Sequence, residues 1–112
     1  RDDEGRMVRG AEALVAMERA PEFKAPEGNT TLVCICTDAA LSKRDCGMVA
    51  RAATAGIARA VDPTFTPVDG DVAFCLASGS GELRPFGSMQ VGAAAATVTA
   101  AAIRDAVRQA SP

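Results

Sequence analysis

Two short apolar runs constrain the fold of this chain more than any other feature of its sequence. Residues Thr30 to Thr37 and Val72 to Ala77 contain mainly Val, Ile, Leu, Phe, Cys, Ala and Thr, and neither run alternates apolar with polar residues. Val, Ile, Phe and Thr favour strands. A strand without polar alternation is typical of a sheet that is covered on both faces. We therefore expect an α/β fold with strands buried between layers.

Helical patterns lie between and after these two runs. Ser42 with Asp45 three residues later forms a variant of the capping box, and the apolar spacing that follows predicts a helix up to Val61. The alanine-dominated segment from Ser88 to Ala110 predicts the last helix.

The first thirty residues are less regular. A short helix is predicted from Gly10 to Ala20, because Pro21 lacks an amide hydrogen and ends a helix. The stretch from Pro21 to Gly28 is typical of an exposed linker, and Gly5 to Val8 could form a short strand or the end of a preceding element.

The sequence offers too few helices to cover both faces of the predicted sheet. Strands buried on both faces need cover on both sides, but this sequence offers only two good helices. We therefore expect the rest of the sheet to come from another chain or from a segment that this sequence does not contain.

Composition excludes several classes of function. The 112 residues include no His, which excludes Ser-His and Cys-His nucleophile pairs and removes the commonest transition-metal ligand. The formal net charge is -2, without a Lys and Arg cluster, so nucleic acid is not an expected partner. There is no apolar run long enough to span a membrane and no secretion signal. We expect one domain at most, in the cytoplasm, without a membrane partner.

The cysteines favour a reduced, cytosolic protein. All four lie in apolar stretches, where we expect them to be buried as small hydrophobic residues. No C-x-x-C pair is present, so the sequence predicts no zinc site, and it contains no motif for a cofactor. The four are Cys34, Cys36, Cys46 and Cys75.

Thr30 is the first candidate for chemistry, because it stands at the head of a strand directly after Gly28 and Asn29. If the Asn29–Thr30 bond were cut, Thr30 would gain an α-amino group with a pKa of about 7.7–8.0, which suits a general base. Nucleophile and base would then belong to one residue. The alternatives are an ordinary turn before a strand and, less suited to a cytosolic chain, a glycosylation sequon.

Asp69 and Asp71 are the second candidates. They flank Gly70 at the entrance of the second strand, and the i, i+2 spacing points both side chains to the same side of a strand. Such a pair can hold the ammonium and hydroxyl of Thr30 or bind a substrate amine, although Asp-Gly is also a common turn signal. The loop from Ser78 to Gly81 is weak as a phosphate loop, because it lacks the full pattern.

Four separate motifs, in order and spacing, resemble the DmpA-type family of L-aminopeptidase/D-esterases, β-peptidyl aminopeptidases and nylon-oligomer hydrolases. The resemblance extends from Gly5 to the final helix. The motifs are Asn29-Thr30-Thr31-Leu32, Thr37-Asp38-Ala39-Ala40-Leu41-Ser42-Lys43, Gly56-Ile57-Ala58-Arg59-Ala60 and Asp69-Gly70-Asp71-Val72-Ala73-Phe74.

The resemblance implies a precursor that cuts itself between Asn29 and Thr30. Residues 1–29 would be the end of the α chain and residues 30–112 the β chain, joined in a four-layer αββα sandwich. Thr30 would be the nucleophile that forms an acyl-enzyme, and Asp69 and Asp71 match the acidic pair that orients it in nylon-hydrolase-like members. The substrate would be a small peptide or amide.

The resemblance also implies what this chain lacks. The family's oxyanion donor and its Lys belong to the upstream α chain, so we expect this chain to be inactive alone. The upstream α chain is therefore the expected partner, and a homo-oligomer is expected because the layers are incomplete. Two alternatives stay open, namely acyl transfer as in ornithine acetyltransferases and a non-catalytic interaction domain that docks through the segment after Ser88.

Overall fold

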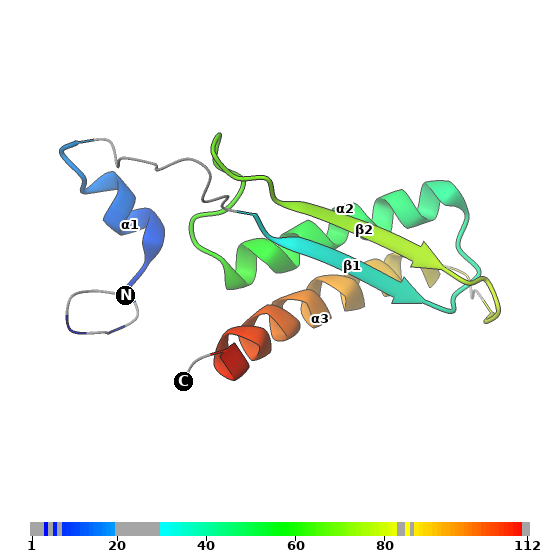
Figure 1. The fold of residues 1–112 in the computed structure, drawn as a ribbon. Helices are drawn as coiled ribbons and strands as arrows, with labels where there is room; N and C mark the ends of the chain where they lie inside the picture. The colour runs from blue at the N-terminus through cyan, green and yellow to red at the C-terminus, as the bar shows by residue number, and fades with distance from the viewer. Residues whose placement is uncertain are drawn as a thin grey trace.

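A two-stranded parallel sheet forms the centre of this computed structural model (Figure 1). Strands β1 (Leu32–Thr37) and β2 (Val72–Ala77) pair with Leu32 opposite Val72 and Thr37 opposite Ala77. Both predicted strands are confirmed, although β1 begins two residues after Thr30. Helix follows strand twice in the order β1, α2, β2, α3, so the chain is of the mixed α/β type.

The structure describes most of the chain, and its longest gap is residues 20–29. The described residues are 4, 6, 8–19, 30–82, 85 and 87–110. The predicted linker from Pro21 to Gly28 lies outside them, as do Gly5 and Met7 of the possible strand from Gly5 to Val8, while Arg6 and Val8 belong to no strand.

The two long helices agree closely with the sequence. Helix α2 (Lys43–Ala60) begins after Ser42, whose hydroxyl accepts a hydrogen bond from the Asp45 amide at 3.1 Å. The Asp45 carboxylate accepts one in return from the Ser42 amide at 3.4 Å, which confirms the capping box. Helix α3 (Gly87–Ala110) begins one residue before the predicted start. No helix in the described ranges is sufficiently long and apolar to cross a membrane.

Helix α1 (Gly10–Val15) is shorter than predicted. The predicted end at Ala20 is wrong, because the helix stops well before the proline. None of its residues is buried. Short helices depend on packing for their stability, so a helix without buried residues has little to support a further turn.

Helices α2 and α3 lie on the same side of the sheet (Figure 1). Val49 and Ala53 of α2 form the core with Ala95 of α3, and the inward residues of both strands pack on them. Small residues allow the two helices to approach closely, and a Cβ on Gly56 would meet the carbonyl oxygen of Ala96. The hydrophobic core therefore lies between one face of the sheet and the helices.

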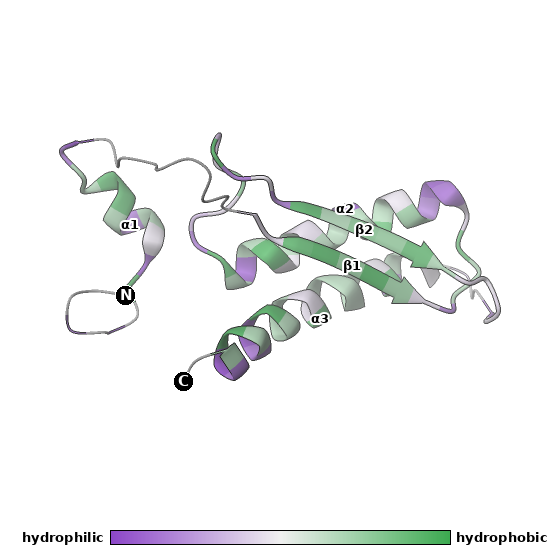
Figure 2. Cartoon of the chain, in the orientation of Figure 1, coloured by the Kyte–Doolittle hydropathy of each residue, from purple (hydrophilic) through white to green (hydrophobic). Residues whose placement is uncertain are grey.

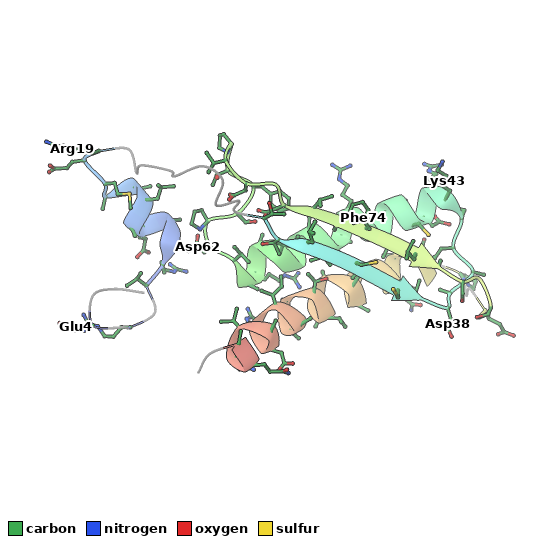
Figure 3. The ribbon with its side chains drawn as sticks, in the orientation of Figure 1. Glu4, Arg19, Asp38, Lys43, Asp62 and Phe74 are labelled. Carbon is green, nitrogen blue, oxygen red and sulfur yellow. The ribbon has the colours of Figure 1, made fainter. Side chains whose placement is uncertain are left out.

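The opposite face of the sheet is apolar and open (Figure 2). Leu32, Leu76 and Phe74 are 70%, 63% and 55% exposed, and Figure 3 shows Phe74 on this face. The described part of the chain covers one face of the sheet, so cover of the second face from another chain or segment stays a prediction. The physical reason is that α2 and α3 both return along one side, and among the described residues no helix or strand covers the other.

The predicted burial of the cysteines is correspondingly wrong for two of them. Cys34 and Cys36 are exposed on the open face, with their sulfur atoms 4.0 Å apart. Cys46 and Cys75 are half-buried on the covered side. All four are free thiols.

Candidate active site

Thr30 lies at the amino end of the sheet, two residues before β1, and is exposed. Its hydroxyl lies against Gly70, because a Cβ on Gly70 would come within 2.7 Å of Thr30 Oγ1. The absence of a side chain at position 70 therefore leaves the space that the hydroxyl occupies. The sequence indicated Gly70 only as a turn residue, and it contained no signal for this close approach.

The Asp71 carboxylate connects three neighbouring segments. Its Oδ1 accepts a hydrogen bond from the Thr31 amide at 2.8 Å, which fixes the backbone next to Thr30. Its Oδ2 accepts one from the Thr64 hydroxyl at 2.7 Å and one from the Phe65 amide at 2.9 Å. Phe65 has a positive φ of 56°, a conformation that is uncommon for a residue other than Gly. Asp71 therefore fastens an irregular loop to the start of β1.

These hydrogen bonds also stabilise the charged form of the Asp71 carboxyl group. The Phe65 amide contributes most, and the Thr64 hydroxyl and the Thr31 amide add to it, so the pKa of Asp71 is lower than usual despite an opposing desolvation effect. Hydrogen bonds to the charged form favour that form. Asp71 is therefore an anion at neutral pH.

Asp69 makes a different set of contacts. Its Oδ2 accepts hydrogen bonds from the Thr66 amide at 2.9 Å and from the Thr66 hydroxyl at 2.6 Å. Its Oδ1 has no hydrogen bond to the described residues. One oxygen of Asp69 is thus used to shape the turn from Thr66, and the other is available to a ligand.

The structure brings the predicted site residues together but bonds them differently from the prediction. Thr30, Asp69 and Asp71 line one cavity. In the described residues, neither carboxylate is hydrogen-bonded to Thr30 itself, and Asp71 instead holds the amide of Thr31. Asn29 lies outside the described residues, so the structure does not describe the predicted cleavage site.

The sequence reading missed Thr64 and Thr66, which bond the two carboxylates. The spacing of Thr66 and Asp69 is typical of a side-chain-stabilised turn, and this was the available signal. The pairing of Thr64 with Asp71 had no local signal.

The cavity has a volume of about 770 Å³ and is partly open. Its polar lining consists of Thr30, Thr31, Thr66, Asp69 and Asp71. Its other walls are mainly apolar and come from α1 and from residues 63–68. Figure 1 shows α1 beside the amino ends of the strands. The arrangement places an accessible hydroxyl and two carboxylates in one partly enclosed space.

Other candidate sites do not join this cavity. Within the described ranges, no three His, Cys, Asp or Glu side chains gather as metal ligands. The loop from Ser78 to Gly81 follows the carboxyl end of β2, at the opposite end of the sheet from Thr30, and its Ser78 and Ser80 hydroxyls bond each other at 2.8 Å.

The comparison with known proteins decides the family. The model of Peptidase family S58 matches residues 4–112. The chain belongs to Peptidase family S58. This confirms the resemblance to the DmpA-type family.

The curated relatives that match this chain are mycobacterial. An uncharacterized aminopeptidase of Mycobacterium tuberculosis and one of Mycobacterium bovis are each 40% identical over 96 residues, which is 75% of this chain. An uncharacterized aminopeptidase of Mycobacterium leprae is 48% identical over 54 residues, or 48% of this chain. The chain spans only 28%, 28% and 15% of the lengths of these relatives. No solved structure matches.

Proposed function

We propose that this chain is the C-terminal part of an N-terminal-nucleophile aminopeptidase or amidase that cuts itself between Asn29 and Thr30. The observation that carries the proposal is the position of the Thr30 hydroxyl, which lies against Gly70 in a cavity that also contains Asp69 and Asp71. Family membership and the names of the relatives support a peptidase.

Self-cleavage would begin with attack by Thr30 Oγ1 on the carbonyl carbon of Asn29. The peptide C–N bond breaks as the new C–O bond forms, and the proton that leaves the Thr30 hydroxyl is transferred to the Thr30 nitrogen, which becomes an amine. Water then hydrolyses the ester. The products are residues up to Asn29 with a free carboxylate and a chain that begins at Thr30.

Substrate hydrolysis would use the same hydroxyl. The freed α-amine of Thr30 takes the hydroxyl proton as Oγ1 attacks the substrate carbonyl, and the leaving amine then receives that proton. Water releases the acyl group from the resulting ester. Asp71 supports the step by holding the Thr31 amide, which fixes the backbone that carries the nucleophile. Charge-assisted hydrogen bonds suit this positioning role.

The proposal includes an upstream partner. The relatives are much longer than this chain, and the open sheet face exposes Leu32, Phe74 and Leu76. We propose that residues 1–29 end an upstream α chain, that residues 30–112 are the β chain, and that a second sheet from the α chain covers the open face as in an αββα sandwich. The α chain would also supply the oxyanion donor, so this chain alone would be inactive, and the assembly would form homo-oligomers.

The first prediction concerns position 30. In the complete precursor, Thr30→Ala is expected to abolish both self-cleavage and amide hydrolysis, because it removes the only group that forms the ester. Thr30→Ser is the matched control, since it keeps the hydroxyl and should retain both reactions. Intact mass under denaturing conditions follows cleavage, and release of p-nitroaniline from an aminoacyl p-nitroanilide follows hydrolysis. Turnover by the purified Thr30→Ala variant would overturn the proposal.

The same assay separates the rival functions. Transfer of the acyl group to an added amino acid in preference to water would identify an acyltransferase. A protein that stays uncut and binds its partner without hydrolysis would instead be an interaction domain.

A further inference from the structure

The cavity beside Thr30 has an apolar wall that the proposed chemistry does not use. Leu14 and Met17 come from α1 and the residues after it, and Val68 comes from the turn before Asp69. Their exposed fractions are 41%, 52% and 51%. Three large apolar side chains thus remain half exposed around one partly enclosed space. Burial of such an apolar surface under a ligand makes a favourable contribution to the free energy of binding.

The charged groups of the same cavity all have one sign. The described lining residues include the carboxylates of Asp69 and Asp71 and no Lys or Arg. Both oxygens of Asp71 already accept hydrogen bonds, from the Thr31, Thr64 and Phe65 groups. Asp69 keeps Oδ1 without a hydrogen bond in the described part of the chain, since both of its bonds go to Oδ2. The cavity can therefore accept one cationic donor and disfavours an anionic ligand.

We infer that the acyl part of the substrate is an amino-acid residue with a free ammonium group and an uncharged apolar side chain of about the size of Leu. The ammonium would bind Asp69 Oδ1, and the side chain would contact Leu14, Met17 and Val68. The α-carbon of an N-terminal residue carries both groups and is bonded to the scissile carbonyl. A substrate whose carbonyl is at Thr30 Oγ1 therefore presents both groups to this cavity. This inference rests on the proposed function and adds the substrate class.

The first test uses substrates and the processed complete enzyme. The p-nitroanilides of leucine, glutamate, N-acetyl-leucine and 6-aminohexanoate share one leaving group. We expect kcat/KM to be highest for leucine and at least about tenfold lower for glutamate, because the acidic side chain meets an acidic, apolar wall. N-acetyl-leucine lacks the ammonium and should be poor as well. A higher kcat/KM for 6-aminohexanoate p-nitroanilide than for leucine p-nitroanilide would overturn the inference and indicate a linear amino acyl substrate. Equal kcat/KM values for the leucine and glutamate anilides would also overturn it.

The second test changes the wall. Met17→Asp and Val68→Asp are expected to lower kcat/KM for leucine p-nitroanilide at least about tenfold, mainly through KM, and to lower that for lysine p-nitroanilide less. Val15→Asp is the matched control, because Val15 follows Leu14 in α1, is 86% exposed and does not line the cavity. All three positions are exposed enough to tolerate a charge without unfolding. An equal loss in the control, or no change in selectivity, would contradict the inference.

A binding measurement keeps this inference separate from the proposed function. If the enzyme hydrolyses none of the anilides, the proposed function fails. Binding of leucinamide and of glutamic acid α-amide, measured by NMR titration, then tests the cavity alone. Leucinamide should bind more tightly, and Val68→Asp should weaken it selectively. Equal binding of the two amides would overturn the inference.

Discussion

The two faces of the sheet are similar in composition and different in surroundings. Val33 and Ile35 point to the covered face and pack on the helices. Phe74 and Leu76 point to the open face and are more than half exposed. Both sets are apolar. An apolar strand residue can therefore lie on a face that its own chain covers or on one that it leaves open. Which face this chain covers depends on the side of the sheet along which its helices return.

The predictions below test this difference between the covered face and the open face of the sheet, beginning with the largest expected effect.

Placing a charge on each face gives the strongest contrast. Val49 has no exposed surface, so Val49→Asp buries an unpaired carboxylate and should lower the free energy of unfolding by more than about 4 kcal/mol. Leu76→Asp on the open face should change it by no more than about 0.5 kcal/mol in this chain. Urea denaturation measures both variants. In the complete precursor, Leu76→Asp should become nearly as harmful, which soluble yield would show. Similar destabilisation of the isolated chain by both variants would refute the contrast.

Two glycines of α2 give a second contrast within one helix. A Cβ on Gly56 would meet the Ala96 carbonyl oxygen and come within 2.7 Å of Thr99 Cβ. Gly56→Ala should therefore cost about 1–3 kcal/mol through overpacking against α3. No described atom outside the local helix backbone lies within 4 Å of a Cβ on Gly47, so Gly47→Ala should stabilise by about 0.5–1 kcal/mol. Thermal unfolding of the two variants compares them, and a stabilising Gly56→Ala would show that the helices are not closely packed.

Thiol alkylation compares the faces without mutation. Cys75 lies on the covered side, where burial and then the neighbouring Cys46 thiol raise its pKa to about 11, so it should react slowly. Cys34 and Cys36 are exposed. Desolvation, followed by the Cys36 thiol, also raises the pKa of Cys34, so access is what distinguishes the faces. With iodoacetamide at pH 8, the exposed pair should react at least about tenfold faster, as read by peptide mass spectrometry.

The same reagent tests the proposed second sheet. Cys34 and Cys36 should become protected when the upstream α chain is present. Unchanged reactivity of Cys34 and Cys36 in the complete precursor would mean that the α chain packs elsewhere and that this face of the sheet stays open.

The smallest expected effect is at the amino ends of the strands, where hydrogen bonds rather than apolar cover hold the structure. The pKa of Asp71 is lowered from its usual 3.8, chiefly by the Phe65 amide. Its contribution to stability is therefore complete above about pH 4 and is lost as the pH falls through the lower pKa of the folded state. Asp71→Asn should remove this part of the acid dependence. Unfolding followed from pH 7 to pH 2 measures it, and identical acid profiles of variant and parent would contradict the assignment.

Local sequence signals were sufficient for most of the elements. The capping box of Ser42 and Asp45 placed the start of α2, and the apolar run from Val72 to Ala77 coincides with β2. Helix α1 was predicted too long, since a proline can only end a helix that packing has stabilised that far. The carboxylates of Asp69 and Asp71 were singled out, but their partners in the loop from Thr64 to Thr66 were not.

The sequence by itself determined which segments form strands and helices, because propensity, capping and apolar spacing act between neighbouring residues. It also supplied the nucleophile candidate, Thr30. Only the tertiary structure decided that both long helices return along one face and that the Thr30 hydroxyl lies against Gly70. It likewise decided that Asp71 holds the Thr31 amide. These features join residues about forty positions apart, and such contacts depend on the packing of whole elements rather than on any local pattern.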